Sequence, residues 1–164
     1  MIVISDTSPL NYLVLIGAID VLPRLFNAVY APNAVLQELL DQAAPNVVRE
    51  WAQSPPTWLT ILDPSSRLPS TARLHLGEAH AISLAKELKI ADILIDERRG
   101  RKVATQEGLL PIPTLAVLER AAERGFLDLP SAVERLRQTT MRVPEELLEL
   151  ALRRDAARRT TEEA

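Results

Sequence analysis

The sequence contains no cysteine, which excludes disulfide bonds, thiolate zinc sites and cysteine nucleophiles together. Histidine is also scarce, since only His75 and His80 occur. On one helix these two side chains would point about 140° apart, because successive residues are rotated by about 100°. They therefore do not form a paired set of metal ligands, and any metal in this protein must be held by oxygen.

Long hydrophobic runs are missing as well. The apolar stretch from Leu13 to Leu22 is interrupted by Asp20, and no run approaches the roughly 18 residues that cross a bilayer. The segment Met1–Asp6 has no basic region and has the pattern of a first strand, so we expect no export signal there. These absences predict a protein that does not associate with membranes and is cytoplasmic.

An excess of positive charge is the third absence, because the formal net charge is -3. This argues against a protein that binds nucleic acid over its whole surface, so only local clusters of charge remain of interest. The length of 164 residues fits one ordinary domain, and 47% apolar with 25% charged residues is typical of globular proteins. We find no internal repeat and no low-complexity segment.

Strand and helix patterns alternate along the chain. Strands are expected at residues 2–5, 28–30, 58–62, 91–95 and 110–112. Helices are expected at residues 7–16, 19–26, 34–40, 45–53, 77–88, 98–107, 115–124, 130–137 and 144–159. We expect a surface loop at 63–71 and frayed residues at 160–164. This alternation predicts an α/β fold with three layers, in which helices cover both faces of a parallel sheet.

Two acids follow apolar strands directly. Asp6 comes after Ile2–Ser5, and Asp96 comes after Ile93–Ile95. Because ligands bind outside the carboxyl ends of strands in an open parallel sheet, the two acids are expected to share a site. Glu38 and Glu78 lie on predicted helices that can reach the same place. Four converging carboxylates repel one another, so their natural neutraliser is one or two divalent cations.

Each of these acids also has a simpler interpretation. Asp6 and Asp96 are placed to cap the helices that follow them, and Glu38 on an amphipathic helix is compatible with a solvated charge. Glu78 is compatible with a first-turn carboxylate that the helix dipole favours. However, Glu78 extends the apolar stripe that contains Ala81, so its side chain is expected to point inward and to need a partner.

A cluster of cations follows Asp96. It comprises Arg98, Arg99, Arg101 and Lys102. Such a run is often a solvated helix face, but here it adjoins the predicted site and is suited to bind RNA phosphates or to pair with the carboxylates. The few aromatic residues lack the spacing of a base-stacking platform and are expected in the core. His80 is expected on the surface flank of its helix.

Four segments occur in a characteristic order. They are Ile4–Leu10 (ISDTSPL), Val35–Leu39 (VLQEL), Leu76–Ile82 (LGEAHAI) and Leu94–Ala104 (LIDERRGRKVA). Together they resemble the PIN domain, and more narrowly the DUF3368-type branch of PIN-like proteins related to VapC toxins. The resemblance covers about residues 1–130. Residues 131–164 would then be a C-terminal helical extension packed on the same domain.

The resemblance implies a five-stranded sheet of order 3-2-1-4-5 and a metal-dependent endoribonuclease, the toxin of a type II toxin-antitoxin pair. It implies Mg²⁺ or Mn²⁺ as cofactor, RNA as substrate, a cognate antitoxin as partner and a homodimer. The catalytic and metal-binding residues it implies are Asp6, Glu38, Glu78 and Asp96. The substrate-binding residues are Thr7, Ser8, Arg98, Arg99, Arg101 and Thr114.

The chain departs from the family pattern at three positions. Pro113 stands where relatives have glycine before Thr114, His80 stands where they often have an acid, and Glu97 replaces an aspartate. Proline lacks the N–H that glycine would offer to a phosphate or carboxylate. Pro113 and His80 leave open an alternative function, a PIN-fold RNA-binding or assembly module with weakened chemistry. A phosphatase that uses Asp6 as a phosphorylated nucleophile is disfavoured, because position 8 is serine instead of a second aspartate.

Overall fold

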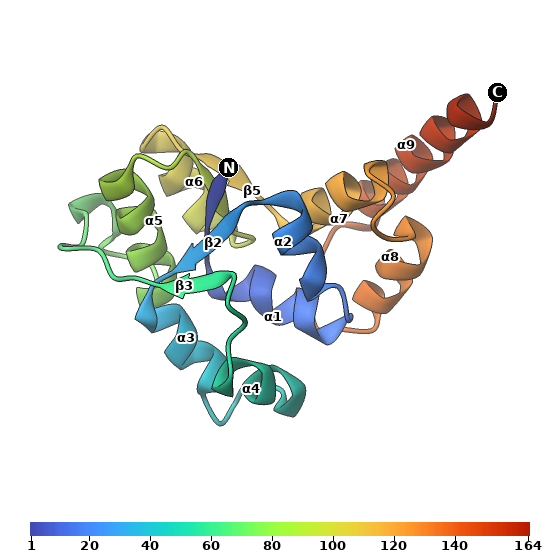
Figure 1. Ribbon diagram of the computed structural model, residues 1–164. Helices are drawn as coiled ribbons and strands as arrows, with labels where there is room; N and C mark the ends of the chain where they lie inside the picture. Colours follow the sequence, from blue (N-terminus) through green and yellow to red (C-terminus); the bar gives the residue numbers. More distant parts are fainter.

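The computed structural model describes residues 1–164 and is built around one five-stranded sheet (Figure 1). The strands are β1 (Ile2–Ser5), β2 (Ala28–Ala31), β3 (Leu59–Ile61), β4 (Asp92–Leu94) and β5 (Leu110–Ile112). All neighbours pair in parallel, and their order is β3-β2-β1-β4-β5. The predicted α/β fold class and strand order are therefore confirmed.

Helices connect successive strands. The α-helices are α1 (Thr7–Leu15), α2 (Leu22–Leu25), α3 (Asn33–Leu40), α4 (Asn46–Gln53), α5 (Leu76–Leu88), α6 (Arg98–Gln106), α7 (Thr114–Glu123), α8 (Leu129–Arg137) and α9 (Glu145–Glu163). Two 3-10 turns, η1 (Ile19–Val21) and η2 (Pro69–Thr71), complete the list. No helix in the structure combines the length and the apolar character that crossing a membrane requires.

Apolar side chains alternate between the two faces of the sheet, as the pleat of a strand requires. Val3 and Leu94 belong to a core of 29 buried residues, which α1, α7, α8 and α9 help to cover. Ile4 and Ile93, their neighbours along the strands, belong to a second core of 9 buried residues under α5 and α6. The central strands are therefore buried on both faces, which explains why they are almost entirely apolar.

The C-terminal helices share the larger core. Val133 and Leu136 of α8 and Leu148 and Ala151 of α9 are buried in it, together with residues of α7. This part of the chain thus packs against the same hydrophobic core as the sheet. The division of the chain at residue 130 stays a prediction.

Two local predictions were wrong. The segment 63–71 is not entirely a surface loop, because it ends in η2, whose Thr71 is fully buried. The last residues do not fray, because α9 continues to Glu163. The hydroxyl of Thr160 donates to the carbonyl of Ala156, and Arg158 pairs with Glu162 at 3.2 Å. These contacts between residues four apart support the final turns.

The order of the strands reverses at the centre of the sheet. The chain passes from β1 to β2 and β3 on one side, then returns to place β4 on the other side of β1. The connections on the two sides of β1 leave in opposite directions, so a crevice opens above the carboxyl ends of β1 and β4. Asp6 and Asp96 follow these two strands.

Candidate active site

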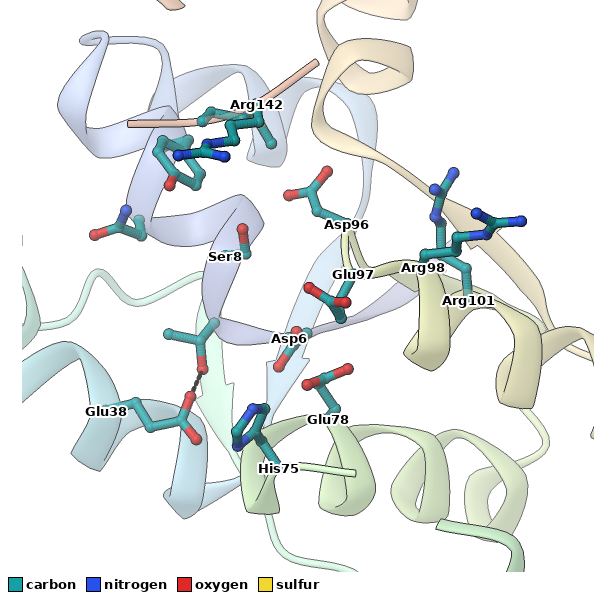
Figure 2. A pocket seen from close by; sticks show the side chains of 14 residues that line it. Asp6, Ser8, Glu38, His75, Glu78, Asp96, Glu97, Arg98, Arg101 and Arg142 are labelled. Carbon is teal, nitrogen blue, oxygen red and sulfur yellow. Dashed lines mark hydrogen bonds between the residues drawn. The ribbon is translucent and has the colours of Figure 1, made fainter. Parts of the chain in front are cut away.

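A hollow of about 740 Å³ lies at the carboxyl ends of β1 and β4 (Figure 2). Its lining consists of Asp6, Thr7, Ser8, Asn11, Tyr12, Glu38, His75, Glu78, Asp96, Glu97, Arg98, Arg101, Met141 and Arg142. The four acids expected to converge thus lie around one cavity, although β1, α3, α5 and β4 bring them from different parts of the chain. We refer to this cavity as the acidic cavity.

Asp6 is the most deeply placed of these acids. Its backbone N–H donates to the carbonyl of Leu94 at 2.9 Å, which extends the pairing of β1 with β4, and its side chain is only 4% exposed. Oδ1 is buried without a hydrogen-bond partner. Asp6 occupies the N-cap position of α1 but makes no side-chain capping bond, so the simpler capping interpretation is wrong. Burial, followed by the charges of Glu78, Glu38 and Asp96, raises the pKa of Asp6 to about 8 against the lowering effect of the Thr7 N–H.

Glu78 reaches the cavity from the first turn of α5. Its residue is 6% exposed, which confirms the inward orientation that the apolar stripe of the helix predicts. Oε2 is buried and has no hydrogen-bond partner. Burial raises the pKa of Glu78, the negative charge of Glu97 adds to this effect, and His75 opposes it.

Asp96 is held in place from α7. The Thr114 N–H donates to Oδ1 and the Thr114 hydroxyl donates to Oδ2, both at 2.7 Å. Burial raises the pKa of Asp96, against the lowering effects of these two bonds, of the Ser8 hydroxyl and of the charge of Arg101. Asp96 does not begin α6, whose N-cap residue is Glu97, so capping of the next helix is also wrong for this residue.

Thr114 itself is fully buried and does not line the acidic cavity. Both of its donors are used on Asp96. The residue therefore positions a carboxylate, whereas the sequence suggested a direct contact with substrate. Pro113 removes no donor from this contact, because the bond comes from the N–H of the following residue.

Glu38 occupies the edge of the cavity and is exposed. Its carboxylate accepts a hydrogen bond from the hydroxyl of Thr7 (Figure 2) and another, at 3.2 Å, from the N–H of Gly77. A Cβ at position 77 would lie 2.8 Å from both carboxylate oxygens, so glycine permits this close approach. Glu38 is thus tied to α1 and α5, not simply solvated as the alternative interpretation suggested.

The side chains in the cluster of cations after Asp96 do not all point toward the cavity. Arg98 and Arg101 line the acidic cavity, whereas Arg99 and Lys102 are exposed and do not. One turn of α6 cannot point all four side chains the same way, because residues one apart lie about 100° from each other. The side chain of Arg99 lies outside the cavity, and its predicted contact with a substrate stays a prediction.

Sequence reasoning missed several lining residues. Asn11 and Tyr12 lie three and four positions after Ser8 on α1, so helical spacing was an available signal for both. His75 immediately precedes α5, where its proximity to Glu78 was also foreseeable. Nothing in the sequence points to Met141 and Arg142, which come from the connection between α8 and α9.

Comparison with known families gives a clear result. The family model described as DUF3368, a PIN domain, matches residues 2–156. The chain belongs to this PIN-domain family. Searches of curated proteins and of solved structures found no match. PIN domains are generally nucleases and typically use divalent metals, so a nuclease-type function is indicated.

The carboxylate oxygens in this PIN domain are of the kind that binds a hard divalent cation, but they do not form a complete coordination site. No group of three or more histidine, aspartate or glutamate side chains is arranged to hold an ion as it stands. However, Asp6 Oδ1 and Glu78 Oε2 are buried oxygens without partners beside Asp96. Mg²⁺ suits such a site, because it usually keeps several waters and takes only one or two carboxylates from the protein.

Gly100 of α6 allows Glu78 to be buried. A Cβ at this position would lie 2.5 Å from Glu78 Oε2 and 2.6 Å from Ile95 Cδ1. Alanine at an ordinary helical glycine stabilises a protein by about 1 kcal/mol. At this position we expect Gly100→Ala to destabilise the PIN domain by about 1–3 kcal/mol instead, because it overpacks the site. Urea unfolding measures the change, with the exposed Thr105→Ala on the same helix as control. A stability gain in Gly100→Ala would contradict the close packing.

The raised pKa of Asp6 predicts how stability changes with pH without metal. Since its pKa is 3.8 ordinarily and about 8 when folded, the folded protein binds the extra proton between these values. The contribution of Asp6 to stability is therefore fully present below about pH 4 and is lost as the pH rises through 8. We expect Asp6→Asn to remove this loss, making the variant more stable than the wild type near pH 8 by on the order of a few kcal/mol.

The measurement is the free energy of unfolding in urea and EDTA between pH 5 and pH 8.5. Asp92→Asn serves as control, because Asp92 begins the same strand that leads to Asp96. Parallel pH profiles for the wild type and Asp6→Asn would show that Asp6 is not the group whose proton is linked to folding.

Proposed function

We propose that this PIN domain is a Mg²⁺- or Mn²⁺-dependent endoribonuclease that hydrolyses RNA phosphodiester bonds. The observation that carries the proposal is the pair of buried carboxylate oxygens without partners, on Asp6 and Glu78, in a cavity at the reversal point of the sheet. Leaving buried acids without hydrogen bonds costs stability unless a ligand uses them. A site of this type is a functional candidate on physical grounds alone.

Asp6, Glu78 and Asp96 would hold the metal ion, with Glu38 at the edge of the same cavity. When bound, the ion supplies a water of lowered pKa as nucleophile and neutralises charge on the phosphate. No side chain is needed as a covalent nucleophile.

The other residues keep the acids in position and balance their charge. Thr114 fixes both oxygens of Asp96, so this carboxylate cannot rotate away from the cavity. Arg98 and Arg101 offset part of the negative charge of the five carboxylates that line the cavity, and this reduces the repulsion of a phosphate. An acidic protein can thus bind RNA through one locally basic side of its cavity.

The proposed role as the toxin of a type II toxin-antitoxin pair, with a protein antitoxin and a homodimeric state, rests on the resemblance to VapC-related proteins. We expect expression of the wild type, but not of Asp6→Asn, to stop growth of a host cell. Light scattering of the purified protein measures its state of assembly. Harmless expression of an active ribonuclease would exclude the toxin role without affecting the proposed chemistry.

Two departures from the family pattern kept the alternative of a binding module open. Pro113 and His80 do not line the acidic cavity. His80 instead faces a neighbouring hollow of about 360 Å³, which also includes Asp41 and Asp63. Neither departure therefore removes a group from the site, which supports the enzyme over the module.

The main test compares the wild type and Asp6→Asn with mixed RNA in EDTA and in millimolar Mg²⁺ or Mn²⁺. We expect cleavage to need the metal and to fall more than about 100-fold in the variant, because a metal ligand is lost. Asp92→Asn is the matched control, since it makes the same change at the opposite edge of the sheet, where β4 begins. Newly formed RNA ends are mapped by sequencing.

Cleavage by Asp6→Asn at the wild-type rate, or cleavage in EDTA, would contradict the mechanism. Folded wild type that binds RNA but never cuts it would establish the binding module.

A further inference from the structure

The connection between α8 and α9 forms one side of the acidic cavity. Met141 and Arg142 of this connection belong to the same lining as Asp6 and Asp96. Figure 2 shows Arg142 and the pair Arg98 and Arg101 on different sides of Asp96. The negatively charged centre of the cavity therefore has cations on two sides, which the cluster after Asp96 alone does not provide.

Hydrogen bonds tie this connection to α1. The hydroxyls of Tyr12 and Thr140 lie 3.0 Å apart, and the Met141 N–H donates to the Thr139 hydroxyl at 3.2 Å. From the end of α8, the Arg135 guanidinium donates to the carbonyl of Ile16 at 2.7 Å. The position of Arg142 beside the cavity is thus fixed by these contacts of the preceding residues and by its two neighbours, Met141 and Val143, which pack against the larger core.

Arg142 has no partner of its own. Its side chain makes no hydrogen bond and no ion pair in the structure, whereas the nearby Arg137 is bonded to Glu145 at 2.5 Å. The residue is exposed. Its five N–H donors are consequently available to an anionic ligand, and their planar arrangement matches two oxygens of a phosphate.

A second hollow of about 640 Å³ continues from the acidic cavity along α1. Asn11 lines both spaces, and Gln138, Thr139 and Thr140 form one side of the second. The amides of Asn11 and Gln138 suit hydrogen bonds to ribose, bases and phosphate oxygens, whereas the Thr139 hydroxyl already donates to the carbonyl of Leu136. Arg135, the cation in its lining, is already bonded to the carbonyl of Ile16.

We propose that Arg142 binds a phosphate of single-stranded RNA next to the bond that is cut, and that residues 138–140 receive the strand beyond it. This inference rests on the proposed function and names how its substrate is held. A strand crossing the acidic cavity is then held by Arg98 and Arg101 on one side of Asp96 and by Arg142 on the other. We favour RNA over an acidic peptide as the ligand. The proposed reaction acts on a phosphodiester bond in the acidic cavity, so the ligand that reaches Arg142 from there carries further phosphates.

Binding is tested apart from cleavage, in EDTA, with proteins that all carry Asp6→Asn. Fluorescence anisotropy of a labelled 12-nucleotide single-stranded RNA gives the Kd at several salt concentrations. We expect Arg142→Ala to weaken binding about 5- to 10-fold and to reduce the slope of log affinity against log salt by about 0.7, the value for one phosphate contact. Arg153→Ala is the matched control, because Arg153 is an exposed arginine of α9 outside both hollows.

The second hollow is tested by adding a negative charge to it. We expect Gln138→Glu to weaken binding of the 12-nucleotide RNA at least 3-fold while leaving a tetranucleotide almost unaffected, since the shorter strand does not extend so far. Gln53→Glu on the exposed face of α4 is the control for net charge. Thermal unfolding of each variant confirms that it is folded.

Equal affinities of the Arg142→Ala and Arg153→Ala proteins would overturn the proposal, as would a lack of RNA binding by the parent protein. Binding of an oligoglutamate peptide as tight as that of RNA, and equally dependent on Arg142, would overturn the assignment to RNA. A different result would contradict the proposed function. In that case the wild type would bind RNA through Arg142 but would not cleave it in Mg²⁺ or Mn²⁺.

Discussion

Burial of acidic side chains at one edge of the sheet is the constraint on which the rest of this structure depends. Asp6 and Glu78 are each 6% exposed or less, and neither has a cation bonded to its buried oxygen. Loss of hydration opposes folding and raises the pKa of Asp6, Glu78 and Asp96, and repulsion from neighbouring carboxylates adds to this effect for Asp6 and Glu78. The two hydrophobic cores that cover both faces of the sheet offset this cost and hold the acids together.

Many surrounding residues serve to make this arrangement possible. Thr114 provides two hydrogen bonds to Asp96, and the glycines at positions 77 and 100 leave space for carboxylates that a Cβ would displace. Their effect is to place carboxylates accurately in a region of low dielectric, where electrostatic interactions are stronger than in water. The site is therefore destabilising for the empty protein and suited to ligands, a combination that is common at functional sites.

Particular elements show how far the sequence could be interpreted. Apolar runs such as Ile2–Ser5 predicted the central strands, because strands buried on both faces must be apolar. Local patterns also predicted that Glu78 points inward, since residues three and four apart share a helix face. In contrast, the pattern around Thr114 did not reveal that its donors are used on Asp96, and the end of α9 was placed too early. Both points concern hydrogen bonds, which hydrophobic periodicity does not report.

The sequence by itself determined the strand and helix elements, the four acids of the candidate site and, through their order, the PIN-domain family. The elements follow from short-range patterns, in which each residue is interpreted with neighbours a few positions away, and the family follows from the order of the four segments along the chain. Only the tertiary structure decided which groups share the cavity with those acids. It placed Arg142 there and turned Arg99 away. The physical reason is that packing of α8 and α9 against the core brings distant residues together, and no local periodicity encodes that contact.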